Sequence, residues 1–583
     1  MVKNDEVAAR LEELADLLEA QDVEYKPRAY RDAAENVLGH AESIESLAAE
    51  GLDAVTTIEG VGEAIGEKLI EYVETGSIEA LDEQRAALPV DMTALTRVEG
   101  VGPRTVGTLY EALGIRDLDD LEAAAEAGEI REVPGFGAKT EQNILERIPF
   151  ARAAGERTLL EDGRTVGEAV RTFLDGIEGV DRVALAGSIR RFRPTIGDVD
   201  VLVATRAGEE VVDAVAEWDR IEDVIESGDT KTSLRIDGLG VDIRLVAPEE
   251  FGSALQYFTG SREHNVTLRN RAIDRELKIN EYGVFEITAD ERAAADTRAG
   301  TRIAGETEDG VYGAVGLPWI PPELREDRGE IAAAAAGDLP DLLEPGDLCG
   351  DLHVHTDYSD GDASIEKMLE AAVEFGHDYV AITDHAAGPG VFGNSGLTDD
   401  QLRDQLEAVR SAAESVPVEV FTGVEANVDV DGTVLETDPE LLAELDVVVA
   451  SPHSNLGGDD DQTDRLLAAI EQPAVNVLGH PSGRLLNQRP AMEFDPVALG
   501  EAAAAHDVAL EVNANPHRLD LWGRAVQVAV KAGATIVINT DAHAPTELSY
   551  QRFGLHTARR GWAEPADVLN AWPVADVRGF LEG

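Results

Sequence analysis

From Leu348 to the end of the chain, short apolar segments alternate with segments of helical periodicity. Segments such as YVAIT, VVVAS and TIVINT are typical of buried strands, and SIEKMLEAAVEFG, which precedes one of them, is typical of an amphipathic helix. Because parallel strands need crossover connections, strands that alternate with helices predict a parallel sheet. We therefore expect a barrel-like arrangement whose functional site lies at the carboxyl ends of the strands.

Histidines and carboxylates follow these strands, in the segments DLHVHTDYSDG, ITDHA, FTGVEAN, ASPHS, LGHPS and NTDAHA. One histidine after a strand is usually structural, but six histidines joined by three acidic residues form a mixed imidazole and carboxylate set. Such a set suits Mn²⁺, Zn²⁺ or Fe better than Mg²⁺ alone. The candidate metal ligands are His353, His355, Asp360, His385, Glu425, His453, His480, Asp541 and His543.

Three segments nearer the amino terminus share a different pattern: IEGVGEAIGEKLI (58–70), RVEGVGPRTVGTL (97–109) and EVPGFGAKTEQNIL (132–145). Each has a Gly-x-Gly turn followed by a predicted helix, and glycine there allows positive φ and exposes backbone amides that can bind phosphate. A single copy would fit a plain interhelical turn equally well, but three copies resemble helix-hairpin-helix motifs, which bind the nucleic-acid backbone. The candidate DNA-binding glycines are Gly60, Gly62, Gly100, Gly102, Gly135 and Gly137.

Two apolar strands in the middle of the chain carry carboxylates. AGSIRRFRPTIGDVDVLVAT (186–205) places Asp198 and Asp200 on one face of a strand, because strand side chains alternate. TSLRIDGLGVDIRLVA (232–247) predicts two strands around an Asp-Gly turn and places Asp242 in the second. If this hairpin pairs beside the first strand, the three carboxylates converge and form a site suited to two Mg²⁺ ions. A two-metal site stabilises the attacking and leaving oxygens of an in-line phosphoryl transfer.

These segments resemble the nucleotidyltransferase signature of the family X DNA polymerases. The resemblance rests on Gly187-Ser188, Arg190-Arg191, Gly197 to Asp200, Val241 to Arg244 and the Tyr-Phe-Thr-Gly-Ser segment at 257–261. LKINEYGVF and GLPWIPPELRE resemble the thumb region of the same family. The resemblance implies that Asp198 and Asp200 hold both metals, Mg²⁺ or Mn²⁺, while Asp242 binds the catalytic metal and helps activate the primer 3′-hydroxyl.

The same resemblance implies the residues that bind the nucleotide and the DNA. The nucleotide-binding residues would be Ser188, Arg191, Gly197, Tyr257, Phe258, Gly260 and Asn265. Ser188, Arg191 and Gly197 would surround the triphosphate, and Tyr257 and Phe258 would line the sugar pocket. Asn265 would read the minor-groove edge of the base pair. Arg269 would contact the template strand, within a stretch (262–278) that has five basic and three acidic residues.

Lys68 lies on the helix expected after the first glycine turn. In some members of the resembled family, a lysine there forms a Schiff base with the sugar of an abasic site and releases 5′-deoxyribose phosphate. Such an amine must be partly deprotonated. Lyase activity and an exposed helical lysine are both open interpretations, and the acidic neighbours Glu63, Glu67 and Glu71 favour the second.

The carboxy-terminal part resembles the PHP (polymerase and histidinol phosphatase) domain, a phosphoesterase with three metals in a distorted β/α barrel. All nine ligand positions of that family are filled by the residues named above. The resemblance implies hydrolysis of a phosphodiester and, next to a polymerase, 3′-to-5′ exonuclease activity with processing of 3′ ends. A metal site that serves folding alone is the less favoured alternative.

The chain is strongly acidic, with 115 Asp and Glu against 49 Lys and Arg, and only eight of the basic residues are lysines. An acidic, lysine-poor surface suits a halophilic protein, because concentrated salt screens its self-repulsion. The alternative, that this acidity excludes nucleic acid, requires low salt, since the Debye length is only about 3 Å at 1 M salt. Arginines keep bidentate geometry under such screening.

The single cysteine, Cys349, excludes an intramolecular disulfide and fits a reducing compartment. The amino terminus is predicted to be an amphipathic helix rather than a signal sequence, and no apolar run approaches membrane-spanning length. We therefore expect a cytoplasmic protein, acting as a monomer on gapped or nicked DNA and dNTPs.

The expected architecture is multidomain. Residues 1–85 would form a helical domain with one helix-hairpin-helix motif, 86–150 a helical DNA-binding domain with two more, and 151–250 an α+β nucleotidyltransferase palm. Residues 251–330 would form a thumb-type subdomain, 331–347 a linker, and 348–583 the PHP domain. The predicted function is that of a DNA polymerase that fills short gaps during DNA repair, including base excision repair. The chain would also act as a 3′-to-5′ exonuclease. The alternative is a PHP phosphoesterase with a noncatalytic DNA-binding front half.

Overall fold

The computed structural model describes residues 4–21, 23, 26–39, 44–58, 60–96, 98, 101–155, 157–228, 230–288, 297–388, 396–434, 437–456, 461–487, 489 and 491–582. The chain divides into two compact units. Met1–Arg157 and Val266–Glu276 make up the first unit, and Thr158–Asn265 and Leu277–Gly583 make up the second. Each unit has a hydrophobic core of its own.

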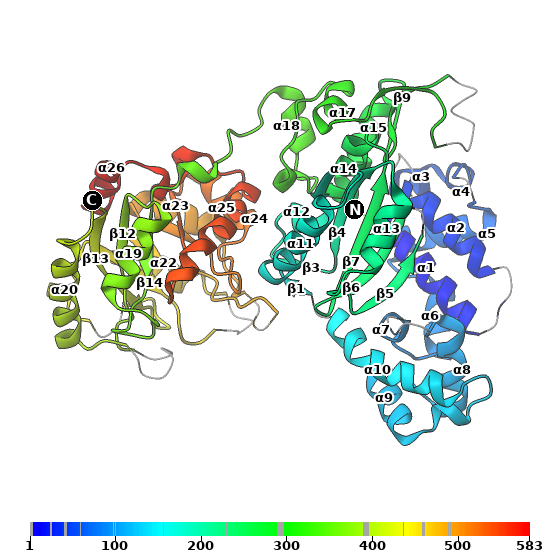
Figure 1. The fold of residues 1–583 in the computed structure, drawn as a ribbon, viewed down its shortest axis with the longest axis horizontal. Coiled ribbons are helices and arrows are strands. Elements are labelled where there is room, and N and C mark those ends of the chain that lie inside the picture. Colours follow the sequence, from blue (N-terminus) through cyan, green and yellow to red (C-terminus); the bar gives the residue numbers. More distant parts are fainter. Residues whose placement is uncertain are drawn as a thin grey trace. The chain divides into compact units, whose positions relative to one another are not determined.

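The amino-terminal part of the first unit is helical (Figure 1, blue to cyan). Its helices are α1 (Asn4–Ala20), α2 (Lys26–Gly39), α3 (Ile44–Glu50), α4 (Leu52–Val55), α5 (Glu63–Thr75), α6 (Glu79–Ala87), α7 (Met92–Thr96), α8 (Pro103–Leu113), α9 (Leu118–Ala127) and α10 (Ala138–Gly155), with a 3₁₀ turn at Ile130–Glu132. Apolar residues at helical spacing, such as Leu11, Leu14 and Leu18 of α1, are buried in one core. The predicted helical amino-terminal region is confirmed.

Each Gly-x-Gly turn leads into a helix, as the sequence predicts. Gly62 and Gly102 directly precede α5 and α8, and Gly137 directly precedes α10. Gly60 and Gly135 have φ angles of 78° and 96°, a region that glycine adopts without steric cost. The glycine pattern therefore marks the starts of three helices.

A five-stranded sheet with the order β2-β4-β7-β6-β5 forms the predicted palm in the second unit (Figure 1). Its strands are β2 (Val180–Leu185), β4 (Val199–Thr205), β5 (Asp223–Ser227), β6 (Lys231–Ile236) and β7 (Leu239–Val246). The helices beside it are α11 (Leu160–Asp175), α12 (Gly187–Arg190), α13 (Gly208–Ala216) and α14 (Phe251–Thr259), and β1 (Thr158–Leu159) pairs with β3 (Thr195–Ile196). The β6–β7 hairpin lies next to β4, and β4 and β7 are parallel.

The two faces of β4 are occupied as the alternation predicts. Val199, Val201 and Val203 are buried in a core with side chains of α11 and α13. Leu202 and Ala204 are buried in another cluster with side chains of α14. Asp200 shares the face of these last two residues, because side chains of a strand alternate.

The predicted thumb follows the palm. Its helices are α15 (Arg262–Ile273), α17 (Glu308–Ala314) and α18 (Glu330–Ala336), and a 3₁₀ turn lies at Pro322–Leu324. A small antiparallel sheet with the order β10-β9-β8 consists of β8 (Leu277–Asn280), β9 (Gly283–Glu286) and β10 (Thr301–Ala304).

The carboxy-terminal part is a parallel sheet of seven strands in sequential order, β11 to β17. The strands are β11 (Gly350–Val354), β12 (Tyr379–Ile382), β13 (Glu419–Asn427), β14 (Val447–Ser451), β15 (Val477–Leu478), β16 (Ala509–Asn513) and β17 (Ile536–Asn539). The helices are α19 (Ile365–Phe375), α20 (Asp399–Ala413), α21 (Pro439–Leu442), α22 (Thr463–Ile470), α23 (Pro496–His506), α24 (Gly523–Lys531), α25 (Gln551–Arg560) and α26 (Val574–Glu582).

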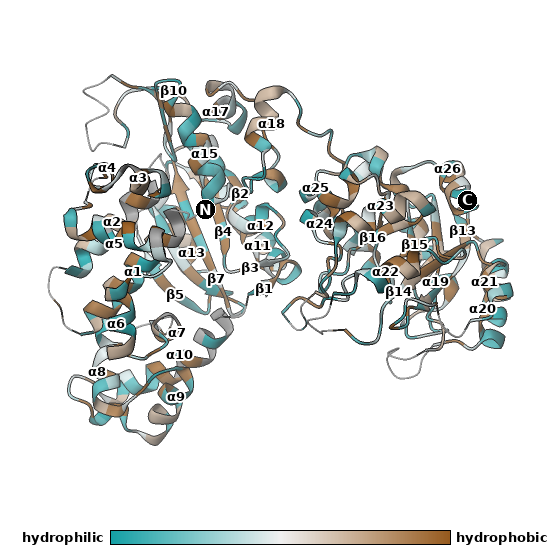
Figure 2. Ribbon diagram, turned by 180° about the vertical axis from the view of Figure 1, so that it is seen from behind, coloured by the Kyte–Doolittle hydropathy of each residue, from teal (hydrophilic) through white to brown (hydrophobic). Residues whose placement is uncertain are grey.

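This sheet nearly closes on itself, because Val354 of β11 forms a parallel bridge with Ala542, just beyond β17. The barrel strands are mostly apolar, whereas α20 is rich in hydrophilic residues (Figure 2). The sequence prediction of a distorted β/α barrel is confirmed.

Side chains of the palm and of the barrel pack against one another within the second unit. Leu519 and Phe553 of the barrel are buried in the same cluster as Leu160 and Ile189 of the palm. The expected linker also packs, because residues 331–336 are part of α18 and Leu343 is fully buried in a barrel core. The other domain boundaries stay predictions. In the part of the chain that the structure describes, no helix is both long and apolar enough to cross a membrane.

Candidate metal centres and nucleotide site

Three carboxylates meet at the start of β4 and β7. The parallel register of these strands places Asp200 opposite Asp242, and Asp198 directly precedes β4. One oxygen of each carboxylate lies within 4.8 Å of the other two. Burial and the neighbouring charges of Asp198 and Asp242 raise the pKa of Asp200 to about 7. Because crowded carboxylates repel one another, the group favours divalent cations.

Neighbouring strand residues place positive charge beside Asp242. Lys231 Nζ lies 2.9 Å from Asp242 Oδ2, and the guanidinium of Arg244 lies 3.7 Å from the same oxygen. Ser233 donates its hydroxyl to Asp242 Oδ1 at 2.6 Å. The sequence interpretation missed Lys231 and Ser233, although alternation along β6 places both on one face of the sheet.

The turn around α12 lies against Asp200. Gly187 has a φ of 60°, and a Cβ there would lie 2.1 Å from Asp200 Oδ2, so the approach requires glycine. Ser188 follows in α12, and Gly197 directly precedes Asp198. Arg191 is buried, donates to the carbonyl of Thr259 at 2.7 Å, and donates through Nε to Glu326 at 2.9 Å. The residues expected to surround a triphosphate are thus gathered at one edge of the sheet.

The end of α14 brings together the residues expected to contact the sugar and the base. The rings of Tyr257 and Phe258 are 5.1 Å apart, edge to face, and the guanidinium of Arg244 lies 4.4 Å from the centre of the Phe258 ring. Asn265 donates to the carbonyl of Tyr257 at 2.6 Å. A Cβ at Gly260 would lie 2.6 Å from the side-chain oxygen of Asn265, so glycine permits this approach.

Two further residues predicted to act on DNA, Arg269 and Lys68, lie on helices. Arg269 lies on α15, four positions after Asn265. Lys68 lies on α5, and its Nζ donates to the carbonyl of Ala64 at 3.1 Å. Gly100 lies outside the described residues. The roles of these residues stay predictions.

Some of the glycines before helices, Gly62 and Gly102 among them, are not required by the protein itself. Gly62 and Gly102 have ordinary extended φ angles of −81° and −82°. A Cβ built at either would meet no described atom within 4 Å. Glycine at these positions therefore leaves room for close approach of a partner to the backbone, which is what phosphate binding at a helix start requires.

A second group of side chains meets at the carboxyl ends of the barrel strands. The side chains form three overlapping groups whose ligand atoms lie within 4.8 Å of one another: His355, Asp360, His385 and His543; His353, His355, Glu425 and Asp541; and His385, Glu425 and His453. His480 joins them, with Nε2 3.0 Å from Glu425 Oε1. The structure thus brings together all nine residues that the sequence singled out.

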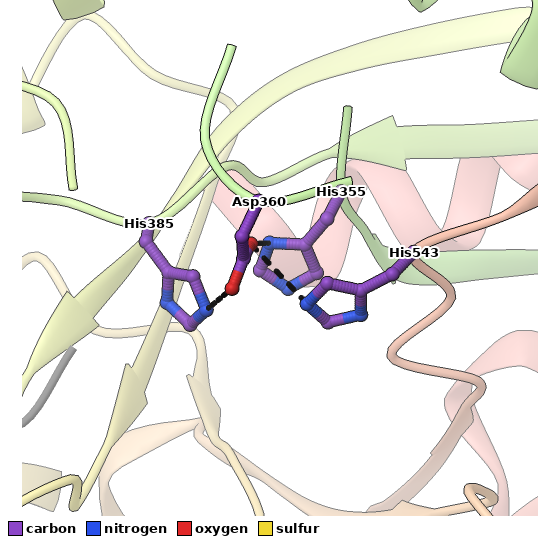
Figure 3. Close-up of side chains that lie close together, drawn as sticks. All are labelled: His355, Asp360, His385 and His543. Atoms are coloured by element: carbon purple, nitrogen blue, oxygen red, sulfur yellow. Dashed lines mark ion pairs between the residues drawn. The ribbon is translucent and has the colours of Figure 1, made fainter. Parts of the chain in front are cut away.

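Figure 3 shows the first of these groups, in which a carboxylate lies among three imidazoles. Asp360 lies 3.4 Å from His385 Nε2, 3.3 Å from His543 Nε2 and 3.8 Å from His355 Nδ1. These imidazoles hold the pKa of Asp360 well below its usual value against the opposing effect of burial. The carboxylate therefore stays ionised, as a metal ligand must be.

Glu425 is fully buried and lies at the centre of the cluster. Its oxygens are 2.7 Å from His385 Nδ1 and 3.3 Å from His453 Nε2. Burial opposes its ionisation, but His385, His453 and His353 hold the pKa of Glu425 well below its usual value. Burial, with the neighbouring His543 and His385, lowers the pKa of His355 to about 3, so this imidazole is neutral.

Buried ligand atoms of the cluster have no hydrogen-bond partner among the described residues. They include His353 Nε2 and both ring nitrogens of His355. A neutral imidazole has one nitrogen lone pair, and buried polar atoms of native proteins are rarely left unsatisfied. These orphaned atoms and the mixed donor set fit a centre for divalent transition metals.

Glu511 of β16 supports this centre, and the sequence interpretation missed it. Its fully buried carboxylate is 2.8 Å from His353 Nδ1 and accepts the backbone N–H of His480 at 2.7 Å. A partner on the second ring nitrogen orients a ligating histidine and sets its tautomer. A charged residue within the apolar strand ALEVN was the available signal, of the same kind that pointed to Asp242.

A cavity of about 250 Å³ opens at this cluster. Besides ligands such as Asp360 and His543, its lining includes Arg489 and Arg518. Arg518 Nε is 3.7 Å from Asp541 Oδ2, and its buried Nη1 has no hydrogen-bond partner among the described residues. The cavity thus combines the ligand cluster with cationic donors, which suits a phosphate-containing substrate.

Comparison with known families agrees with this architecture. The chain matches the families described as Helix-hairpin-helix domain (residues 2–78), SAM-like Helix-hairpin-helix tandem (92–148), DNA polymerase beta thumb (254–326) and PHP domain (351–512). It is 34% identical to the DNA polymerase/3′-5′ exonuclease PolX of Bacillus subtilis over 578 residues, 98% of either chain. It is also 27% identical to DNA polymerase lambda of Rattus norvegicus over 50% of this chain and 52% of that one. For DNA polymerase lambda of Arabidopsis thaliana, the identity is 26% over 47% of this chain and 54% of that one.

Proposed function

The chain belongs to the family X DNA polymerases that carry a PHP domain, and we propose that it fills short gaps in DNA and processes 3′ ends during repair. The palm would add nucleotides to a primer, and the barrel would remove nucleotides as a 3′-to-5′ exonuclease. The observation that carries this proposal is the presence of two separate ligand clusters in one chain, one of three carboxylates and one rich in imidazole.

In the palm, we assign metal binding to the three carboxylates. Asp198 and Asp200 would hold two divalent ions, Mg²⁺ or Mn²⁺, and Asp242 would hold the ion on the primer side and help activate the 3′-hydroxyl. The bound ions would neutralise charge on the attacking and leaving oxygens. Lys231 and Ser233 hold Asp242 in place from β6, so its carboxylate is oriented before substrates bind.

Nucleotide binding is assigned to the turn around α12 and the end of α14. Ser188, Arg191 and Gly197 would contact the triphosphate, and a guanidinium is suited to bind phosphate in a bidentate way. Tyr257 and Phe258 would line the sugar pocket, and Asn265, which Gly260 allows to come close, would contact the base pair.

In the barrel, the nine clustered side chains would hold three divalent metals of the Mn²⁺, Zn²⁺ or Fe type. Such metals supply an activated water and neutralise charge on a phosphodiester. Glu511 orients His353 within this set. Arg489 and Arg518 line the adjoining cavity, where they would contact the phosphate of the 3′-terminal nucleotide.

DNA binding is assigned to the glycine turns and to α15. Backbone amides at the starts of α5, α8 and α10 would contact phosphates, and Arg269 would contact the template strand. Such contacts do not need surface lysines, which suits a chain with eight lysines and a formal net charge of −66. The composition supports activity in concentrated salt.

Several finer assignments belong to the same proposal. A DNA repair substrate favours the cytoplasm as the site of action, and we propose that the chain acts as a monomer on gapped or nicked DNA with dNTPs. Lyase activity of Lys68 is not favoured, because Glu63, Glu67 and Glu71 are its neighbours in sequence and its Nζ donates to the Ala64 carbonyl of its own helix.

The test is primer extension on a one-nucleotide gap in molar KCl, with Mg²⁺ or Mn²⁺, and with or without dNTP. Extension with dNTP and Mn²⁺-dependent shortening without it are the expected results. Shortening alone would contradict the polymerase assignment and leave a PHP phosphoesterase with a noncatalytic front half. Extension alone would contradict the nuclease assignment.

A further inference from the structure

Helix α25 of the barrel contacts the palm through two side chains one turn apart. His556 and Arg560 are four positions apart in the sequence, so they share one face of the helix. They contact consecutive palm residues, since His556 stacks on Phe192 and Arg560 donates to the carbonyl of Arg191. The barrel thus holds the turn that follows α12.

Arg560 and Arg191 both form an ion pair with one carboxylate, that of Glu326. Its Nη1 donates to the Arg191 carbonyl at 2.6 Å and to Glu326 Oε1 at 3.0 Å. Arg191 Nε donates to the same Glu326 oxygen at 2.9 Å. All three side chains are less than 10% exposed. A buried ion pair is favourable only when its geometry is good. Because both guanidinium groups bind the same carboxylate oxygen, the position of each arginine restricts that of the other.

Glu326 is ionised in this arrangement. Burial opposes its charge, but Arg560 and Arg191 lower the pKa of Glu326 to about 2. Without Arg560, the carboxylate would pair mainly with Arg191, and with Arg193 at 3.6 Å. A carboxylate that holds Arg191 more tightly would compete with any phosphate for the same guanidinium.

The backbone beside Arg191 is also held from the barrel. Phe192 has a φ of 52°, which residues other than glycine rarely adopt. Its ring lies between His556, with centroids 3.4 Å apart, and the guanidinium of Arg164 at 4.3 Å. His556 is in turn fixed by Glu323, whose Oε1 lies 2.6 Å from its Nδ1. The unusual turn is therefore enclosed on both sides.

We propose that Arg560, a residue of the PHP domain, is a positioning residue for nucleotide binding by the palm. It fixes the backbone of Arg191 and shares the charge of Glu326, and so orients the Arg191 guanidinium. This inference rests on the proposed function, in which Arg191 binds the triphosphate. The nuclease domain is then a structural part of the polymerase site.

The expected effect is on nucleotide affinity. In Arg560→Ala, the KM for dNTP should rise about tenfold, which corresponds to one charge-assisted hydrogen bond. The kcat should change much less, because the three carboxylates of the palm are not touched. Exonuclease activity should stay at the wild-type level, since Arg560 is not among the residues that line the barrel cavity.

The experiment measures gap filling and exonuclease activity on the same full-length preparations in molar KCl with Mg²⁺ or Mn²⁺. R560A is compared with R560K, which keeps the charge and should restore part of the affinity, and with R578A. Arg578 pairs with Glu419 on the exposed surface of the barrel and is the matched control, with a wild-type KM expected. R191A is the reference for loss of the triphosphate contact.

A wild-type KM for dNTP in R560A would overturn the proposal. So would a parallel loss of extension and exonuclease activity, because that result indicates a general structural defect. If R560A lacks a cooperative melting transition, R560Q carries the test, since its amide can still donate to the Arg191 carbonyl but brings no charge to Glu326. A raised KM there supports the proposal, and a wild-type KM overturns it.

Failure of the proposed function would look different. If the wild-type protein does not extend a gapped primer, or if R191A has a wild-type KM, the assignment of Arg191 fails and this proposal fails with it. If wild type and R191A behave as expected and R560A has a wild-type KM, only the role of Arg560 is refuted.

Discussion

The palm and the barrel both gather ligands where parallel strands meet, but in contrasting surroundings. In the palm, Asp198 is exposed, Asp200 and Asp242 are half-buried, and Lys231 lies beside Asp242. In the barrel, most of the nine ligands are buried, and imidazole nitrogens among them have no hydrogen-bond partner in the described residues. An accessible site of hard oxygen ligands suits metals that arrive with the nucleotide, whereas a buried nitrogen-rich site suits metals that stay bound.

The largest expected effect separates the two sites by their chemistry. Asp200→Asn should lower nucleotide incorporation by on the order of 100- to 1,000-fold, because it removes a charged ligand shared by both proposed metals. Exonuclease activity of the same preparation should be unchanged. Primer extension and shortening on one gapped substrate measure both quantities. Incorporation at the wild-type rate would show that the palm carboxylates do not catalyse the transfer.

The second prediction tests whether the barrel retains its metals. Wild-type protein dialysed into metal-free buffer should keep bound transition metal, and His355→Ala should lose most of it together with exonuclease activity, because two of the ligand groups contain His355. Elemental analysis of the dialysed proteins measures the metal content. Asp200→Asn is the control and should retain the wild-type content. Equal metal content in H355A and wild type would contradict the contrast between the sites.

A smaller effect is expected at Glu511, which supports the metal-ligand cluster of the barrel. Glu511→Gln keeps the shape of the side chain but removes the charge that faces His353 Nδ1. Exonuclease activity or metal affinity should fall about 10- to 100-fold, as for other partners of metal-bound histidines. Metal titration and exonuclease rates measure the change, while gap filling should be retained. Wild-type metal affinity and exonuclease rate in E511Q would show that Glu511 serves packing alone.

The smallest effect is expected in the first unit, to which neither cluster belongs. Gly102→Ala should leave the melting temperature nearly unchanged, because the φ of −82° and the open space around the glycine both accept a methyl group. Affinity for gapped DNA should fall severalfold if a phosphate approaches the amides there. Fluorescence anisotropy with labelled DNA measures the affinity. The rate at which the barrel hydrolyses a free nucleotide ester serves as the control. Unchanged affinity would remove the helix start of α8 from the DNA interface.

Much of each site was predictable, because its ligands lie in short segments with a clear pattern. The alternation along β4 placed Asp198 and Asp200 on one face, and the Asp-Gly turn predicted the hairpin that carries Asp242. The strand-following histidines predicted the barrel cluster in the same way. These inferences succeeded because periodicity and turn chemistry are local properties of the chain.

The supporting residues were not predicted. A charge within an apolar strand marks Glu511, but the roles of Glu511 and Lys231 depend on the neighbour that packing brings to each of them. The segment 331–347, predicted to be a linker, contains Leu343, whose burial in the barrel core follows from packing with distant side chains. Local composition does not reveal which distant side chains will cover a segment.

The sequence by itself determined which segments form strands, helices and glycine turns, and which residues can act as ligands, since these depend on neighbours along the chain. Only the tertiary structure decided which of those segments meet. Arg560 and Glu326 are 234 positions apart, and neither carries a motif that points to the other. Their contact follows from the packing of α25 against the palm, because proximity of distant residues is a property of whole elements and their shared core.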